Sequence, residues 1–214
     1  MDELLSMLNW SGVSEKAQRT KQSCIQNLAD GEASFSPLVQ VAEDTGGGLA
    51  PAFDEAGFTK PSRVDLVRDG RHSGSMVSPR TAAEYGIAAN GADEDESMVA
   101  MAVAPGALSE EQSLAALDTG LYIGNLHYLN FSDRAHGRVT GMTRFATFWV
   151  EGGRVVAPVN VMRWDDTLYR MLGDNLEALT DQSHWILDSR TYGHRSVQTS
   201  RVPGALLRKM AFTL

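Results

Sequence analysis

The sequence predicts an α+β protein that is dominated by antiparallel β-sheet. Three segments rich in Tyr, Phe, Val and Thr follow one another at residues 121–132, 138–151 and 154–164, and such residues are enriched in strands. Short turn sequences join these segments, as in a long meander that could curl into a barrel-like sheet. The 214 residues include 20 glycines, which suits many tight turns. We therefore expect a mainly antiparallel sheet with a few short flanking helices.

Residues 1–36 are expected to form a helical lead-in to a single domain that spans residues 1–214. Leu4, Leu5 and Leu8 recur at helical spacing and would share one buried face. A second helix is expected between an N-cap at Ser14 and a stop at Gly31, and its apolar side chains again form one stripe.

The next part of the chain is expected to form strands and one short helix. Residues 37–44 alternate between apolar and polar side chains, as in a half-buried strand. Segments 63–68 and 72–78 should pair through a tight turn at Asp69 and Gly70, because both residue types tolerate positive φ. Residues 80–85 should be helical, since Ser-Pro precedes them and glycine follows.

Residues 87–110 are expected to form an exposed acidic loop. Four successive carboxylates at residues 93–96 repel one another and would be stable only in solvent. A short helix should follow Ser109, which begins a capping box. A longer helix is expected at residues 165–179 from its amphipathic spacing, and terminal strands are expected near residues 185–187 and 206–214.

The charge and composition exclude several classes of function. With 27 acidic and 19 basic residues the net charge is −8, which disfavours direct nucleic-acid binding because contact with phosphates depends on Lys and Arg. Cys24 is the single cysteine, and Asp2 and Glu3 stand where a secretory signal would carry basic charge. No run approaches the roughly 20 apolar residues of a membrane span. We therefore expect a cytoplasmic protein without a membrane segment.

Common catalytic motifs are also missing from the sequence. A helical zinc protease motif needs two histidines one turn apart with a glutamate between them, and the five histidines are scattered. His127 and His136 could face each other across a hairpin, although a metal site would normally need further ligands. Cys24 lies on the apolar stripe of an expected helix, which favours an inert buried thiol over a nucleophile. No catalytic residue and no metal ligand are predicted.

Several runs in the chain resemble the C-terminal domain of the TldD/TldE (PmbA) metalloprotease family. These are GLYIGNLHYLN at 120–130, VTGMTR at 139–144, FWVEGG at 148–153, APV at 157–159, and FDEAG at 53–57 with the Asp69–Gly70 hairpin. The likeness covers nearly the whole chain, but it corresponds to only the second half of a full family member.

The resemblance implies a cytoplasmic protease system with two kinds of subunit. A TldD-type subunit holds zinc through an HExxxH helix and a cysteine near its C-terminus, and a metal-free TldE-type partner pairs with it around a channel for unfolded peptides. This chain has no such helix, and no cysteine stands near Tyr192, Gly193 and His194. It is therefore similar to the metal-free type, with zinc expected in the partner. The family is also described as a modulator of DNA gyrase, for which the acidic charge gives no support.

Three hypotheses for function follow. In the first, the chain binds unfolded peptide for a zinc-bearing TldD-type partner, with Gly141, Thr143 and Arg144 in contact with the peptide, because glycine permits close approach and arginine binds carboxylates. In the second, it is a non-enzymatic module that pairs with a copy of itself through open sheet edges. In the third, it is an independent hydrolase whose site is built from His127, His194 and nearby Asp residues. Whether this chain is itself an enzyme is left open.

Overall fold

The computed structural model describes residues 1–54, 57–193 and 195–213. Glu55, Ala56, His194 and Leu214 lie outside the described residues, so neither the middle of the FDEAG motif nor the His194 candidate can be placed. Within the described part, strands form three separate sheets and the helices are short. The α+β class with mostly antiparallel sheet is confirmed.

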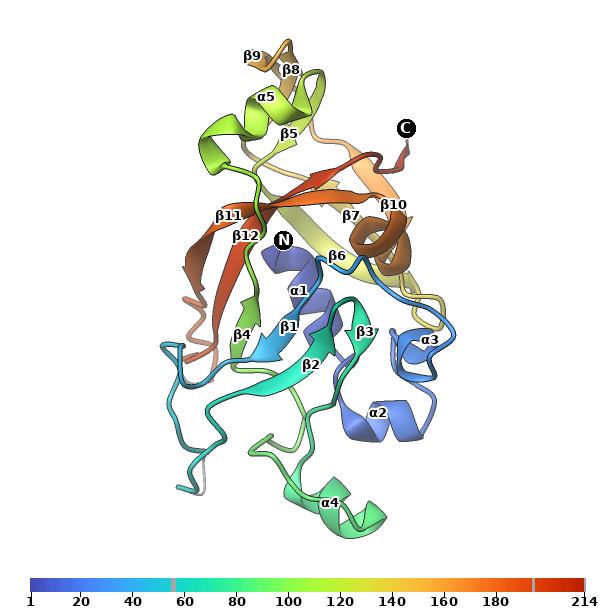
Figure 1. Ribbon diagram of the computed structural model, residues 1–214, viewed down its shortest axis with the longest axis vertical. Coiled ribbons are helices and arrows are strands. Elements are labelled where there is room, and N and C mark those ends of the chain that lie inside the picture. Colours follow the sequence, from blue (N-terminus) through green and yellow to red (C-terminus); the bar gives the residue numbers. More distant parts are fainter. Residues whose placement is uncertain (55–56, 194, 214) are drawn as a thin grey trace.

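The largest sheet has six strands and forms the lower and middle part of the molecule (Figure 1). Its neighbours are antiparallel except for β12 and β4, which run parallel. In spatial order the strands are β11 (Leu176–Leu187), β12 (Thr199–Leu207), β4 (Ala100–Val103), β1 (Val41–Glu43), β2 (Val64–Arg68) and β3 (Arg71–His72).

The predicted meander is divided between two smaller antiparallel sheets, and neither closes into a barrel within the described residues. Turns at Gly124 and at Phe145, which has φ of +57°, split the long segments into shorter strands. The four-stranded sheet contains β13 (Phe212–Thr213), β10 (Arg163–Thr167), β7 (Arg138–Thr143) and β6 (Leu126–Asp133). The three-stranded sheet contains β5 (Gly120–Ile123), β8 (Thr147–Glu151) and β9 (Arg154–Pro158).

The helices connect and flank the sheets. The second predicted helix is interrupted at Lys21, which has φ of +58°, so it becomes two short helices. The helices are α1 (Asp2–Asn9), α2 (Glu15–Arg19), α3 (Gln26–Ala29), α4 (Pro79–Tyr85), the short turn η1 (Glu110–Gln112), α5 (Ser113–Leu117) and the π-helical turn η2 (Arg170–Asp174). No described helix is long and apolar enough to cross a membrane.

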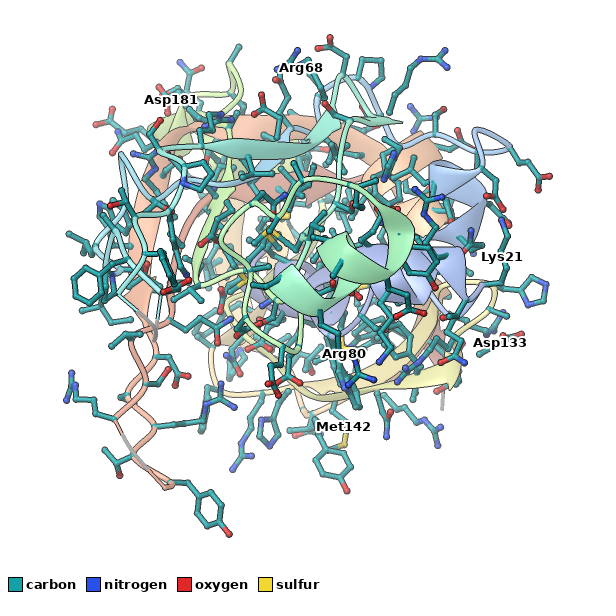
Figure 2. The ribbon with its side chains drawn as sticks, turned by 90° about the horizontal axis from the view of Figure 1, so that it is seen from below. Lys21, Arg68, Arg80, Asp133, Met142 and Asp181 are labelled. Atoms are coloured by element: carbon teal, nitrogen blue, oxygen red, sulfur yellow. The ribbon has the colours of Figure 1, made fainter. Side chains whose placement is uncertain are left out.

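The core lies between the six-stranded and four-stranded sheets, and α1 contributes a full apolar face to it. Figure 2 shows Arg68 on β2 and Met142 on β7 at opposite edges of the molecule, so the two sheets have their outer faces on opposite sides. Trp164 of β10 is completely buried in this core. The residues contributed by α1 are Leu4, Leu5, Met7 and Leu8.

Two local predictions are confirmed by the backbone. Asp69 and Gly70 both have positive φ and join β2 to β3 in a tight hairpin. A side chain at Gly70 would also place its Cβ 2.3 Å from the carbonyl oxygen of Phe35, so glycine is required there. Ser78 caps α4 by accepting a hydrogen bond from the Thr81 amide, and Gly86 ends the helix in the left-handed conformation.

The expected helix at residues 165–179 is wrong. Residues 163–167 instead form β10, which pairs with β7 along its whole length, and the chain returns to strand at Leu176. Between them Met171 and Leu172 insert into the core from the π-helical turn η2, inside which Gly173 has a non-helical backbone with φ of −107° and ψ of −112°. The spacing of apolar residues matched a helix because buried residues of the turn after β10 and of the first part of β11 fall at that interval.

The expectation of an exposed loop throughout residues 87–110 is also wrong. All four residues of β4 are buried, because this strand lies between β1 and β12 at the centre of the largest sheet. A strand with neighbours on both sides and apolar cover on both faces is a continuous apolar run rather than an alternating one. Residues 93–95 are exposed as predicted, but Glu96 is only 1% exposed.

Candidate functional site

Two adjoining clefts lie along the β11–β12 hairpin. The first, which we call the tip cleft, has a volume of about 950 Å³ and lies between α1 and the outer end of the hairpin. The second, which we call the side cleft, has a volume of about 1120 Å³ and lies between β12, α5 and β5. Asp2, Glu3 and Ile186 line both clefts, so together they form one groove beside the hairpin.

The tip cleft is polar and carries mainly negative charge. Its charged lining residues are the carboxylates Asp2, Glu3, Asp95 and Asp188 and one cation, Arg190. Arg190 binds Asp188 at 2.7 Å, and this contact holds the pKa of the Asp188 carboxyl far below its usual range. Burial raises the pKa of Glu3, and the neighbouring Asp2 acts in the same direction. Ser200 of β12 donates a hydrogen bond to Asp2, which ties the hairpin to α1.

The side cleft has a largely apolar wall. Leu114 and Leu117 from α5 line one side, and Leu206 of β12 lies among the residues opposite. Trp149 of β8 also lines the cleft, and its indole N–H donates to Glu151 Oε1 at 2.7 Å. At the rim, His184 Nε2 lies 2.7 Å from Glu110 Oε1 and joins the hairpin to η1.

Glu96 fixes the segment that forms one wall of the tip cleft. Its buried carboxylate accepts hydrogen bonds from Ser14 Oγ at 2.6 Å, the Lys16 amide at 2.8 Å, and both the amide and hydroxyl of Ser78 at 2.9 Å. Glu96 therefore joins the starts of α2 and α4, and its neighbours Asp95 and Ser97 line the cleft. Burial opposes ionisation, but these hydrogen bonds outweigh it and lower the pKa of Glu96.

The three residues predicted to contact peptide lie at the end of β7, outside the lining of either cleft. Gly141 is buried under Trp164, and a Cβ there would lie 3.1 Å from three atoms of the indole. Thr143 is fully buried, and its hydroxyl accepts a hydrogen bond from the Met162 amide at 3.0 Å. Only Arg144 is exposed. Packing accounts for Gly141 and Thr143, while a binding role for Arg144 stays a prediction.

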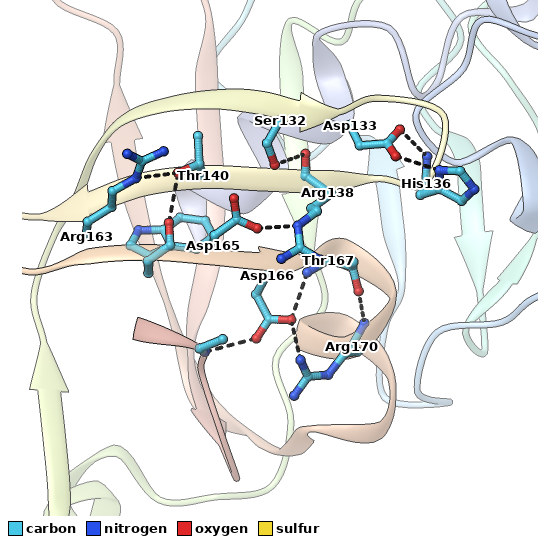
Figure 3. Close-up of polar contacts among 12 residues, drawn as sticks. Ser132, Asp133, His136, Arg138, Thr140, Arg163, Asp165, Asp166, Thr167 and Arg170 are labelled. Atoms are coloured by element: carbon cyan, nitrogen blue, oxygen red, sulfur yellow. Dashed lines mark hydrogen bonds and ion pairs between the residues drawn. The ribbon is translucent and has the colours of Figure 1, made fainter. Parts of the chain in front are cut away.

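Polar contacts on the outer face of the four-stranded sheet are shown in Figure 3. Arg138 binds Asp165, and His136 Nδ1 lies 2.7 Å from Asp133 in the β6–β7 turn. Arg163 donates to the Thr140 hydroxyl at 3.3 Å rather than to a carboxylate. Near the β6–β7 turn the basic side chains of this face therefore have carboxylate partners. Arg163, toward the other end of the strands, contacts a hydroxyl instead.

The histidines do not converge on a shared site in the described part of the chain. His127 lies near the start of β6 and His136 in the turn beyond its end, so at about 3.3 Å per residue the length of β6 separates them by roughly 20 Å. His127 instead contacts Arg144 across the β6–β7 pair. Residues 1–54, 57–193 and 195–213 contain no group of three or more His, Cys, Asp or Glu side chains that could hold a metal.

Cys24 is expected to be chemically inert in the native protein. Its side chain is completely buried, and burial raises the pKa of the thiol to about 12. Because only the thiolate reacts rapidly, a disulfide reagent at neutral pH should modify Cys24 no faster than the protein opens. The measurement is the rate of thiol release in native buffer compared with that in denaturant. Rapid stoichiometric reaction of the native protein would contradict this prediction.

Sequence reasoning missed the groove and the role of Glu96. The groove is formed by α1, α5 and a hairpin whose strands lie far apart from them in sequence, so no local motif indicates it. For Glu96 a signal did exist, because Ser14 and Ser78 each precede a helix start and each helix start favours a nearby carboxylate. Tertiary packing brings the starts of α2 and α4 to the same buried carboxylate, and the sequence alone does not show this.

Three mostly antiparallel sheets, the helix α1 in the core and a groove beside the β11–β12 hairpin define an α+β domain. The family whose members carry this domain is described as the PmbA/TldA metallopeptidase C-terminal domain, and it matches residues 1–214. The chain belongs to this family. The resemblance seen in the sequence is confirmed.

Three solved structures have the same fold. A candidate modulator of a DNA gyrase from Thermotoga maritima aligns with a TM-score of 0.76 and 16% identity, over 99% of this chain and 47% of its own. A second such protein, from Bacteroides thetaiotaomicron, gives 0.73 and 16%, over 99% and 44%. TldE from Thermococcus kodakarensis gives 0.75 and 15%, over 98% and 47%.

The chain spans less than half the length of each of these structures. No curated protein sequence gives a significant match. At these identities the structural likeness establishes the fold alone.

Proposed function

We propose that this domain is the metal-free, peptide-holding component of a TldD/TldE-type zinc metallopeptidase system. The observation that carries the proposal is the groove formed by the tip cleft and the side cleft, which runs beside a long β-hairpin. A groove of this kind suits an extended chain, because the hairpin offers backbone groups and the cleft walls offer pockets for side chains. The zinc and the catalytic water would come from a TldD-type partner.

The character of the groove supports an unfolded peptide as its ligand. Leu114, Leu117 and Leu206 give the side cleft apolar surface that can bury hydrophobic side chains, which an unfolded protein exposes and a folded one does not. The polar tip cleft can solvate a peptide backbone that is not paired with a strand. A reducing, cytoplasmic setting agrees with the single free thiol of Cys24. The charge of −8 argues against direct contact with nucleic acid.

The proposal is tested by mixing the chain with a zinc-bearing TldD-type subunit and an unfolded protein substrate. We expect cleavage by the mixture to exceed that by the partner alone, and Leu117→Asn to reduce the gain roughly tenfold through lost apolar contact. Ala116→Asn is the matched control, because Ala116 lies on the same helix, is exposed and does not line the cleft. Cleavage is followed by the release of fluorescent fragments.

If adding the wild-type chain leaves cleavage unchanged, and the chain binds no unfolded peptide by itself, the peptide-holding role is excluded. Equal effects of Leu117→Asn and Ala116→Asn would show that the side cleft is not where the peptide lies. Circular dichroism of both variants establishes that they remain folded.

A homodimerising module is the second candidate, and the edge strand β9 favours it. All five residues of β9 are exposed, and Val155 and Val156 are 50% and 57% exposed. An exposed apolar edge can pair with the same edge of a second copy. Light scattering distinguishes the two functions, because a stable homodimer that ignores both peptide and TldD-type partner would favour this one. Val156→Lys should then yield a monomer.

A further inference from the structure

Arg144 is a surface cation that the described residues leave without a carboxylate partner. Its guanidinium contacts the ring of His127 on β6 and lies 4.9 Å from the centre of the Phe145 ring. It forms none of the ion pairs in the described part of the chain, although the protein has a large excess of acidic side chains. Because no carboxylate of the described residues occupies the guanidinium, it keeps N–H donors for an anionic ligand.

Two exposed aromatic side chains in unusual backbone conformations belong to this region: Phe145 lies next to the guanidinium, and the ring of Tyr128 lies 6.3 Å from that of His127. Tyr128 on β6 and Phe145 after β7 are 79% and 77% exposed. Both have positive φ, +56° and +57°, which is uncommon for bulky residues and strains the backbone. Residues in strained conformations cluster at binding sites, and exposed aromatics next to arginine are typical of residues that dominate binding energy.

The charge around Arg144 reinforces its preference for an anion. Met142 lies between His127 on β6 and Arg163 on β10 in the strand register, so Arg163 is on the same outer face. Arg163 also lacks an ion pair in the described residues, and its contact is with the Thr140 hydroxyl. At the other end of this face, by contrast, Arg138 is neutralised by Asp165. The face therefore ends in a local positive patch beside two exposed aromatic rings.

This patch adjoins the rim of the side cleft. Asn125, which lines the cleft, accepts a hydrogen bond from the Arg144 amide at 3.0 Å through its carbonyl oxygen. Gly124, also in the lining, donates its amide to Ala146 at 2.7 Å. An extended peptide that leaves the cleft past the β5–β6 turn would therefore reach Arg144. The opposite end of the groove, the tip cleft, carries mainly carboxylates.

We infer that Arg144, with His127 and the rings of Tyr128 and Phe145, binds the carboxylate at the C-terminal end of the extended peptide, a role that rests on the proposed peptide-holding function. The guanidinium binds the carboxylate through two hydrogen bonds, and the aromatic rings cover the last side chain. The bound peptide then has a fixed direction, with its carboxyl end at Arg144 and its preceding residues in the side cleft.

The test compares a short fluorescent peptide of glycine, serine and valine that ends in a free carboxylate with the same peptide ending in an amide. Fluorescence anisotropy gives the affinity of the intact chain for each. We expect the acid to bind about fivefold to tenfold more tightly, and Arg144→Gln to abolish that difference while leaving the affinity for the amide unchanged. Arg144→Lys should retain part of the difference, because it keeps the charge but not the fork.

Arg154→Gln is the control, because Arg154 is exposed on β9 and has no ion pair in the described residues; it should retain the full difference. A third peptide, amidated and with an internal aspartate, distinguishes the source of the carboxylate. An Arg144-dependent gain for this peptide would overturn the C-terminal assignment in favour of an acidic side chain. Equal binding of acid and amide by the wild-type chain, or a difference that survives Arg144→Gln, overturns the inference while leaving peptide binding intact. If neither form binds at all, the proposed function fails, and the carboxylate site fails with it.

Discussion

Replacement of Glu96 by alanine is expected to lower the free energy of unfolding by about 4 kcal/mol. The substitution removes an acceptor for hydrogen bonds from Ser14, Lys16 and Ser78, and most of these donors are sealed from water. Unsatisfied buried donors each cost free energy, and both α2 and α4 lose the anion at their first turn. The measurement is urea unfolding followed by circular dichroism.

The matched control for this prediction is Glu94→Ala in the same acidic run. Glu94 is exposed, so its loss should change the unfolding free energy by no more than about 0.5 kcal/mol. If both variants lost a similar amount of unfolding free energy, Glu96 would affect stability only through the net charge of the protein. The Glu96→Gln variant should lie between the wild type and Glu96→Ala, because an amide retains one acceptor oxygen but places a donor where the carboxylate accepts.

The same carboxylate should make stability depend on pH. Hydrogen bonds lower the pKa of Glu96 in the folded protein below the ordinary value of 4.5, so the unfolded state binds the proton more readily. Its contribution is therefore complete above pH 4.5 and is lost as the pH falls through the lower folded value. Glu96→Gln should flatten this part of the pH profile. An unchanged slope in the variant would contradict the assignment.

Trp164→Ala is expected to lower the unfolding free energy by about 4 kcal/mol. The indole is completely buried between the sheets and packs on Gly141, so alanine leaves a cavity that the strands cannot close. Trp164→Phe keeps most of the volume and should cost about 2 kcal/mol or less. Chemical denaturation of both variants gives the comparison. A loss under 1 kcal/mol for alanine would show that the core between the sheets is not packed as described.

Much of the fold can be predicted from local sequence, and the failures have a common cause. The Asp69–Gly70 hairpin and the α4 caps depend on backbone preferences of single residues, so a short window suffices. The predictions of a helix at residues 165–179 and of a loop at residues 87–110 were wrong because strand pairing with distant partners determines the structure of both segments. β10 pairs with β7, and β4 lies between β1 and β12, and neither pairing is encoded in nearby residues.

The candidate site was less predictable than the fold. The resemblance indicated the family, and Arg144 is the one predicted contact residue that is exposed. Gly141 was predicted because glycine permits close approach of a backbone, but the same property suits packing under Trp164. The Thr143 hydroxyl accepts a hydrogen bond from the Met162 amide inside the fold. The groove arises from α1, α5 and the β11–β12 hairpin, whose approach depends on the whole fold.

Hydrogen exchange with and without an unfolded peptide tests the central claim, that the groove beside the β11–β12 hairpin holds an extended chain. The peptide should slow exchange of amides in α5, in β5 and along β12, which line the clefts, and leave α4 unchanged. No protection at saturating peptide, or protection confined to the edge strand β9, would contradict the claim and leave self-association as the better account.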